Sequence, residues 1–254
     1  MGRIVVFDSG LGSLSIIKAI QKVSKNEIIY FADRKNFPYG KKSRKELESI
    51  IKNSIAGLEK KFHSDLIVIG SNTPTIMLDI ISKNVIGVNP PIKKASKLSK
   101  TNNIGILATE SAIKSKSLST YIENCNLSSK TNVYKINGSK LVELVENGKF
   151  IFDKNYCIKL IQNVLSKRIT KNEIDVITLS STHLPFLKPI LVSEFPHVNF
   201  IDPAANVANT VLKKLKDKQS KRNSLKIYSS DESGVLQKNL SHMGIKNKIN
   251  FLSI

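Results

Sequence analysis

The chain has 254 residues, of which 41% are hydrophobic, and a formal net charge of +20. This length is enough for one large domain or two modest ones with real cores, and the composition excludes a disordered chain. Because no run of 18 apolar residues and no charged-then-apolar leader occurs, we expect a cytoplasmic protein without a transmembrane helix or secretory signal. The two cysteines and four histidines lack metal-ligand spacing, so neither a disulfide framework nor a metal site is expected.

The positive charge has more than one interpretation. Phosphate contacts dominate nucleic-acid affinity, so a net charge of +20 could indicate a nucleic-acid partner. The excess is almost all lysine and is spread along the chain, however, whereas base recognition favours arginine and interleaved aromatic residues. We therefore expect attraction of a small anionic ligand and nonspecific binding to polyanions, with a basic, nucleic-acid-associated protein as the minority alternative.

The first third of the chain alternates strands and helices. The expected strands are 4–7, 27–33, 66–70 and 84–91, and the expected helices are 14–20, 44–62 and 75–81. Ser43 and Glu46 form a capping box before the second helix. The turn at 8–13 has only two glycines of a G-x-G-x-x-G pattern and no P-loop ending, so Asp8 and Ser9 are interpreted as side chains aimed into a cleft, or as helix-capping residues.

The pattern then starts again near residue 92. Expected strands are 103–108, 132–138, 174–179 and 198–201, expected helices are 92–100, 110–115, 141–148, 153–168 and 204–215, and a last strand and helix close the chain. Such alternation predicts an α/β fold with parallel sheets flanked by helices. The repeat indicates two pseudo-symmetric lobes with the site in the cleft between them: lobe one is 1–91 plus 205–254, and lobe two is 92–204.

Two strand ends resemble each other. Residues 66–74 read LIVIGSNTP and residues 176–185 read VITLSSTHLP, each with an aspartate just before it, Asp65 or Asp175. Ligands of open α/β sheets bind where such strands end. The pair therefore predicts two similar halves of one ligand site.

A serine nucleophile is one chemistry that these clusters could support. Neither has the G-x-S-x-G elbow of a hydrolase, and the spacing of Ser181 and His183 does not establish that they are in contact. Serine, threonine and asparagine at strand ends are more often helix caps, which is the simpler interpretation of either cluster alone.

Eight stretches together carry a resemblance to a known family. They are VFDSGLGSLS, YFADRKNFPYGKKS, VIGSNTPT, VIGVNPP, IGILATES, LVELVENG, LSSTHLPFLKPIL and FIDPAANVA, and they run in family order over almost the whole chain. The chain resembles glutamate racemase, of the cofactor-independent aspartate/glutamate racemase superfamily. The resemblance implies two α/β lobes, a glutamate or aspartate substrate, no cofactor, a possible homodimer and a role in supplying peptidoglycan precursors for the cell wall.

The resemblance also implies roles for individual residues. The family interconverts L- and D-glutamate with two cysteine thiols, one on each face of the substrate Cα, and their positions correspond to Ser71 and Ser181. Asp8, His183 and Glu146 would support these two residues. The implied substrate-binding residues are Asp8, Ser9, Pro38, Tyr39, Gly40, Asn72, Thr73, Thr109, Thr182 and His183, while Ala112 replaces a second threonine found in many members.

The two serines leave the function open between alternatives. A thiol has an ordinary pKa near 8.5 and can be tuned to a working thiolate, whereas an alcohol ionises far less readily. Serine at both positions is therefore expected to keep ligand contacts and lose nearly all racemisation. The alternatives are a noncatalytic amino-acid sensor or interaction protein on the same fold and, less favoured, the nucleic-acid-associated protein.

Overall fold

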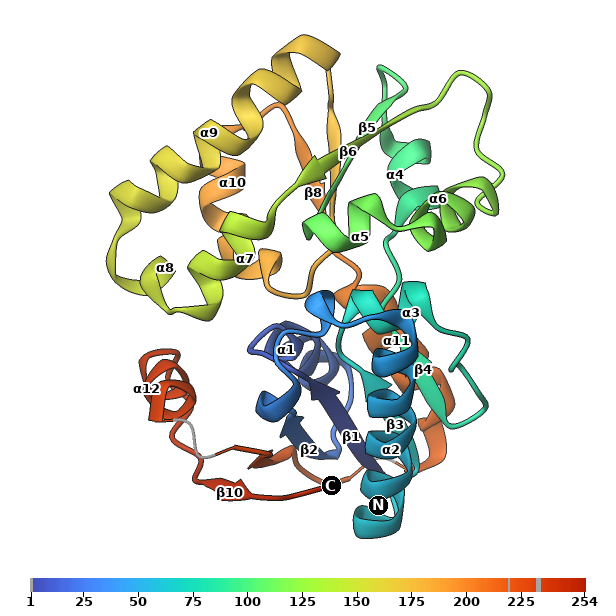
Figure 1. Ribbon diagram of the computed structural model, residues 1–254, viewed down its shortest axis with the longest axis vertical. Coiled ribbons are helices and arrows are strands. Elements are labelled where there is room, and N and C mark those ends of the chain that lie inside the picture. Colours follow the sequence, from blue (N-terminus) through green and yellow to red (C-terminus); the bar gives the residue numbers. More distant parts are fainter. Residues whose placement is uncertain (1, 219, 232–233) are drawn as a thin grey trace. The chain divides into compact units, whose positions relative to one another are not determined.

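A computed structural model of the chain describes residues 2–218, 220–231 and 234–254. It comprises two compact units, one formed by Met1–Val88 with Ala204–Ile254 and the other by Asn89–Pro203 (Figure 1). No helix among the described residues is long and apolar enough to cross a membrane.

The first unit contains a parallel sheet. Its strands are β1 (Arg3–Asp8), β2 (Glu27–Ala32), β3 (Leu66–Ile69), β4 (Val85–Gly87), β9 (Ser224–Ser229) and β10 (Ile249–Phe251). Their order in the sheet is β10-β9-β2-β1-β3-β4, and every neighbouring pair is parallel. The C-terminal segment thus adds two strands to the sheet that the N-terminal segment begins.

Helices surround this sheet. They are α1 (Ser13–Val23), α2 (Arg44–Phe62), α3 (Asn72–Met77), α11 (Ala204–Lys214) and α12 (Gly234–His242), with short 3-10 helices η1 (Arg34–Asn36), η2 (Tyr39–Lys41) and η4 (Lys216–Lys218). Ser43 caps α2, since its side chain accepts a hydrogen bond from the Glu46 N–H at 3.3 Å. The Glu46 carboxylate pairs with Lys42 at 2.9 Å, so the structure shows the serine half of the predicted capping box.

The second unit repeats the arrangement with a smaller sheet. Strands β5 (Asn103–Ala108), β6 (Asn132–Asn137), β7 (Val176–Leu179) and β8 (Asn199–Ile201) lie in the order β6-β5-β7-β8 and are all parallel. The helices are α4 (Ile92–Leu98), α5 (Glu110–Lys114), α6 (Lys116–Glu123), α7 (Ser139–Glu146), α8 (Lys149–Phe152), α9 (Lys154–Asn172), η3 (Leu184–Leu187) and α10 (Lys188–Glu194). Figure 1 shows α9 and α10 on one side of this sheet, and α4 and α6 on the other.

The strand order reverses at equivalent places in the two sheets. In the first unit β1 lies between β2 and β3, and in the second β5 lies between β6 and β7. The carboxyl ends of the two central strands are held alike, because the Gly70 N–H donates to Phe7 O at 2.7 Å and the Ser180 N–H donates to Leu107 O at 2.8 Å. Open α/β sheets bind ligands at such reversals of strand order. The predicted α/β fold with two parallel sheets flanked by helices is therefore confirmed.

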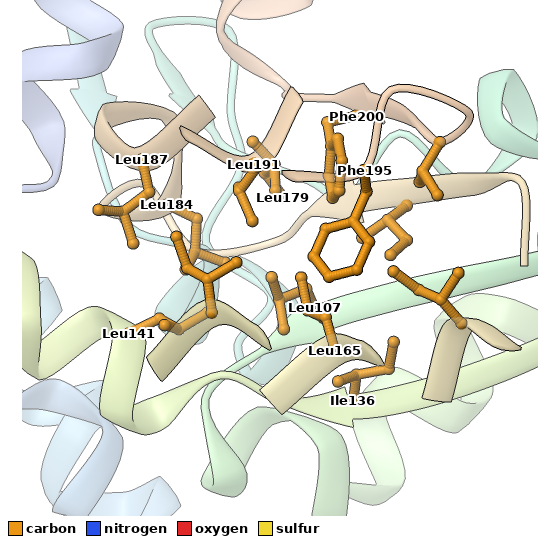
Figure 2. Close-up of a cluster of buried hydrophobic side chains, with 14 of the residues drawn as sticks. Leu107, Ile136, Leu141, Leu165, Leu179, Leu184, Leu187, Leu191, Phe195 and Phe200 are labelled. Atoms are coloured by element: carbon orange, nitrogen blue, oxygen red, sulfur yellow. The ribbon is translucent and has the colours of Figure 1, made fainter. Parts of the chain in front are cut away.

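The central strands of each sheet are buried on both faces. In the first unit alternate strand residues such as Phe7, Phe31 and Ile69 form one cluster with α2, while Ile4 and Val6 on the opposite face are also fully buried. In the second unit, Figure 2 shows Leu107, Ile136 and Leu179 of the strands in one cluster with side chains of α7, α9, η3 and α10. Such double burial explains why the strands read as continuous apolar runs.

Some predicted boundaries were wrong. The third helix ends at Met77 and not near 81, because Leu78 is extended and the chain turns back through a hydrogen bond from Ser82 N–H to Val85 O. The following strand covers only Val85–Gly87 of the predicted 84–91. The final strand β10 was not predicted, since its three residues carry little pattern.

Gly70 follows β3, and its N–H donates to Phe7 O in β1. Substitution of Gly70 tests how closely the chain packs at this strand end. A Cβ at residue 70 would overlap the Cβ of Ser13, closer than real side chains approach. We expect Gly70→Ala to lower the free energy of unfolding by about 1–3 kcal/mol in urea denaturation. Gly234→Ala is the control, because no atom of the described residues beyond its chain neighbours lies within 4 Å of the added Cβ. Equal stabilities for the two variants would contradict this packing.

Candidate functional site

In the first unit, predicted site residues lie where β1 and β2 end. Asp8 is the last residue of β1 and Ser9 follows it, and both are buried. Asp8 Oδ1 accepts a hydrogen bond from the Ser9 N–H at 2.7 Å, and Ser9 Oγ accepts one from the Tyr39 N–H at 3.4 Å. The structure therefore brings Asp8, Ser9 and the loop 38–40 together.

Asp33, the last residue of the predicted strand 27–33, organises this loop. Asp33 is 2% exposed. Its carboxylate accepts hydrogen bonds from Tyr39 Oη at 2.9 Å and from Ser230 Oγ at 3.1 Å. Asn36 Nδ2 donates to both carboxylate oxygens, each at 2.9 Å. Burial, then the negative charges of Asp33 and Asp8, raise the pKa of the Tyr39 phenol well above its usual value. An aspartate at a strand end with asparagine three residues later was the available sequence signal.

Ser71, Asn72 and Thr73 follow β3 and begin α3. Asn72 is 4% exposed and its Nδ2 donates to Val88 O at 2.9 Å, whereas its buried Oδ1 accepts no hydrogen bond within the described residues. Thr75, a further residue that was not predicted, donates to Ser71 O at 2.8 Å and accepts from the Val88 N–H at 3.1 Å. These bonds hold the polar cluster against the strand end and leave one buried acceptor ready for a donor.

In the second unit the structure connects three predicted residues. Ser181 Oγ lies 3.5 Å from His183 Nδ1, and His183 Nε2 lies 2.8 Å from Glu146 Oε2. The side chains of His183 and Glu146 are 9% and 11% exposed. Hydrogen bonds in such shielded surroundings are stronger than in water. Glu146 thus orients the imidazole, and the imidazole faces the Ser181 hydroxyl.

Packing of α7 against η3 creates this contact. Leu141, Leu144 and Val145 of α7 lie in the same buried cluster as Leu184 and Leu187 of η3, and Figure 2 shows Leu141 near Leu184. Glu146 is the last residue of α7, and His183 immediately precedes η3. The apolar faces therefore position two polar side chains that are 37 residues apart in the sequence.

The remaining predicted residues lie near the same strand ends. Thr109 follows β5 and its Oγ1 is 3.2 Å from Ser111 Oγ, while Thr182 lies between Ser181 and His183 and is 2% exposed. Ala112 is buried in α5. Within the described ranges, no three His, Cys, Asp or Glu side chains gather as a metal site requires.

Asp65 and Asp175, noted in both repeats, lie at the opposite ends of the strands. Asp65 accepts from the Arg3 N–H and Lys218 Nζ, and Asp175 accepts from Ser99 Oγ and two backbone N–H groups. Burial raises the pKa of each carboxyl, but these hydrogen bonds outweigh it and hold both pKa values below the usual range. Their role is therefore to anchor the amino ends of β3 and β7.

Comparison with known proteins gives a consistent result over nearly the full length. No protein-family model matches the sequence. A glutamate racemase of Sulfurihydrogenibium sp. is 32% identical over 244 residues, covering 92% of this chain and 90% of that protein. A glutamate racemase of Clostridium botulinum is 30% identical over 240 residues, covering 89% and 91%. The solved Escherichia coli glutamate racemase in complex with L-glutamate and the activator UDP-MurNAc-Ala superposes with a TM-score of 0.84 at 21% identity, covering 99% of this chain and 98% of that one.

The raised pKa of Tyr39 predicts a pH-dependent stability effect. At pH 7, Tyr39→Phe loses the hydrogen bond to Asp33, and we expect its free energy of unfolding to fall by about 1–2 kcal/mol. The unfolded tyrosine ionises near pH 10 while the folded one stays protonated, so the wild type loses stability above that pH and the variant does not share this loss. The difference should therefore shrink by about 1.4 kcal/mol per pH unit above pH 10.

Urea unfolding at pH 7 and between pH 10 and 11 measures this difference. Tyr156→Phe, at a half-exposed tyrosine, is the control and should change stability at pH 7 by less than about 0.5 kcal/mol. A difference between wild type and Tyr39→Phe that stays constant with pH would contradict the assignment.

Proposed function

Since this chain belongs to the glutamate racemase family, we propose that it binds a small anionic amino acid, glutamate or aspartate, at the carboxyl ends of its central strands. The observation that carries this proposal is the gathering of buried polar side chains where the strand order reverses in each sheet. Parallel sheets use this place for ligands, and the diffuse positive charge of the chain favours an anionic one.

The contacts support a division of roles. In the first unit Asn72 Oδ1 is a buried acceptor suited to an ammonium group, and Ser9 and Tyr39 hold the neighbouring loop in place. Thr73, Pro38, Gly40, Thr109 and Thr182 complete the proposed ligand-binding set. Asp8 supports Ser71, and the Glu146–His183 pair supports Ser181, as the family mechanism requires of its proton-transfer residues.

Serine at both proton-transfer positions changes the energetics of the reaction. The pKa of a thiol is near 8.5, whereas that of an alcohol lies far above it, close to that of water. Each pKa unit corresponds to about 1.4 kcal/mol in the cost of forming the anion, so the alkoxide is far more costly to form than the thiolate. We therefore propose that the chain retains ligand binding and has lost nearly all racemisation.

Ligand binding can be tested without turnover. We expect glutamate or aspartate to raise the melting temperature of the protein, because a ligand that binds only the native state stabilises it. Lysine, which has the opposite side-chain charge, should have no effect at the same concentration. Asn72→Leu should abolish the shift through loss of the buried acceptor. No shift with any acidic amino acid would contradict the proposed ligand class.

Restoring the thiols tests the proposed loss of turnover. The double variant Ser71→Cys/Ser181→Cys should increase racemisation of glutamate by at least about 10³-fold over the wild type, because thiols form the required anion far more readily than hydroxyls. Circular dichroism and exchange of the Cα proton in heavy water measure this gain. Each single cysteine variant is a matched control, because one thiol alone cannot serve both faces of Cα.

Two results would overturn this assignment of the serines. Fast Cα proton exchange by the wild-type chain would show that the hydroxyls suffice. A double variant that binds glutamate and remains inactive would favour a noncatalytic binding protein.

A further inference from the structure

Ser181, His183 and Glu146 have the connectivity of a nucleophile, a base and a residue that orients the base. The hydroxyl lies 3.5 Å from His183 Nδ1, and the carboxylate lies 2.8 Å from His183 Nε2. Serine nucleophiles of acyl-transfer enzymes are recognised by these contacts and not by chain order. The 3.5 Å separation is long for a hydrogen bond, but such contacts often shorten when substrate binds.

The bond to Glu146 determines which nitrogen can accept a proton. A carboxylate can only accept, so a neutral His183 carries its proton on Nε2 and donates it to Glu146. His183 Nδ1 then presents a lone pair to the Ser181 hydroxyl. This is the tautomer that a general base for Ser181 requires.

We propose that Ser181 is an activated nucleophile that accepts a small acyl group from an ester. A base that removes a proton from carbon must first become an anion, which is costly for serine. A nucleophile need not, because His183 takes the proton while the new bond forms. The same hydroxyl that fails as a carbon base therefore fits this second chemistry.

The acyl transfer begins at the Ser181 hydroxyl. Ser181 Oγ bonds to the ester carbonyl carbon, its proton passes to His183 Nδ1, and the carbonyl π pair moves to oxygen. That pair returns, the bond to the alkoxide breaks, and His183 protonates the departing alcohol. Water then attacks the acyl-serine, His183 takes its proton, and the acid leaves as Ser181 regains a proton. Since Ser181 is 8% exposed, the acyl group must be small.

This inference depends only on contacts within the second unit and not on binding of glutamate. Ser71, at the equivalent strand end of the first unit, makes no side-chain hydrogen bond in the described part of the chain. Ser71 therefore serves as an internal control for Ser181 in the wild-type protein. A nucleophile created by His183 should be confined to Ser181.

A small alkyl phosphonofluoridate tests the nucleophile directly. Attack by Ser181 Oγ forms an O–P bond and expels fluoride, so the intact mass should increase by one adduct that peptide mapping places on Ser181 and not on Ser71. His183→Gln should slow labelling at least about 10²-fold, and Glu146→Gln at least about 10-fold through loss of orientation. His197→Gln, at an exposed histidine, should label like the wild type.

A measurement on the unchanged protein covers the case in which these variants fail to fold. Nitrogen-15 NMR of the imidazole rings should show His183 protonated on Nε2 and unprotonated on Nδ1. Labelling of Ser181 that depends on His183, together with this tautomer, would support the inference. No adduct on Ser181, equal labelling of Ser71, or a proton on Nδ1 would overturn it, whatever the result for glutamate binding.

Discussion

The burial of both faces of the central strands constrains where this protein can place polar side chains. Strand residues such as Val6, Phe7, Leu107 and Leu179 are completely enclosed. An unpaired polar group among them would cost several kcal/mol, roughly 2–7 depending on the reference state. Polar side chains within these strands must therefore be paired, as Thr178 is with Ser180, and the reversal of strand order leaves room for a ligand at the strand ends beside the central pair. The two serine clusters occupy those positions.

The serine clusters of the two units are held in place by different contacts. After β3, the polar cluster is held by backbone contacts through Asn72 and Thr75, and Ser71 Oγ makes no hydrogen bond to a described residue. After β7, the equivalent serine faces an imidazole that is oriented by a carboxylate. The two strand ends thus share a backbone arrangement, but their side chains differ in chemistry. The difference matters more for serine than for cysteine, because a hydroxyl depends on a neighbouring base.

Much of the fold was predictable because its signals are local. Continuous apolar runs identified the buried strands, and Ser43 identified the start of a helix through a contact three residues away. The errors occur where local signals are weak or overruled. The helix expected to reach residue 81 ends at Met77 because the chain must return to β4, and the three residues of β10 acquire strand structure only by pairing with β9.

The candidate site, like the fold, was predictable from the sequence only in part. The amino-acid sequence alone determined the residue types at the strand ends and the presence of serine at 71 and 181, and its motifs identified the racemase family. Tertiary structure decided which side chains touch: packing of α7 against η3 joins Glu146 to His183, and Ser230 from the C-terminal segment meets Asp33. The physical reason is that strand and helix patterns depend on neighbouring residues. Contacts across 37 or 197 residues depend on how apolar faces pack, and the order of residues along the chain does not contain that information directly.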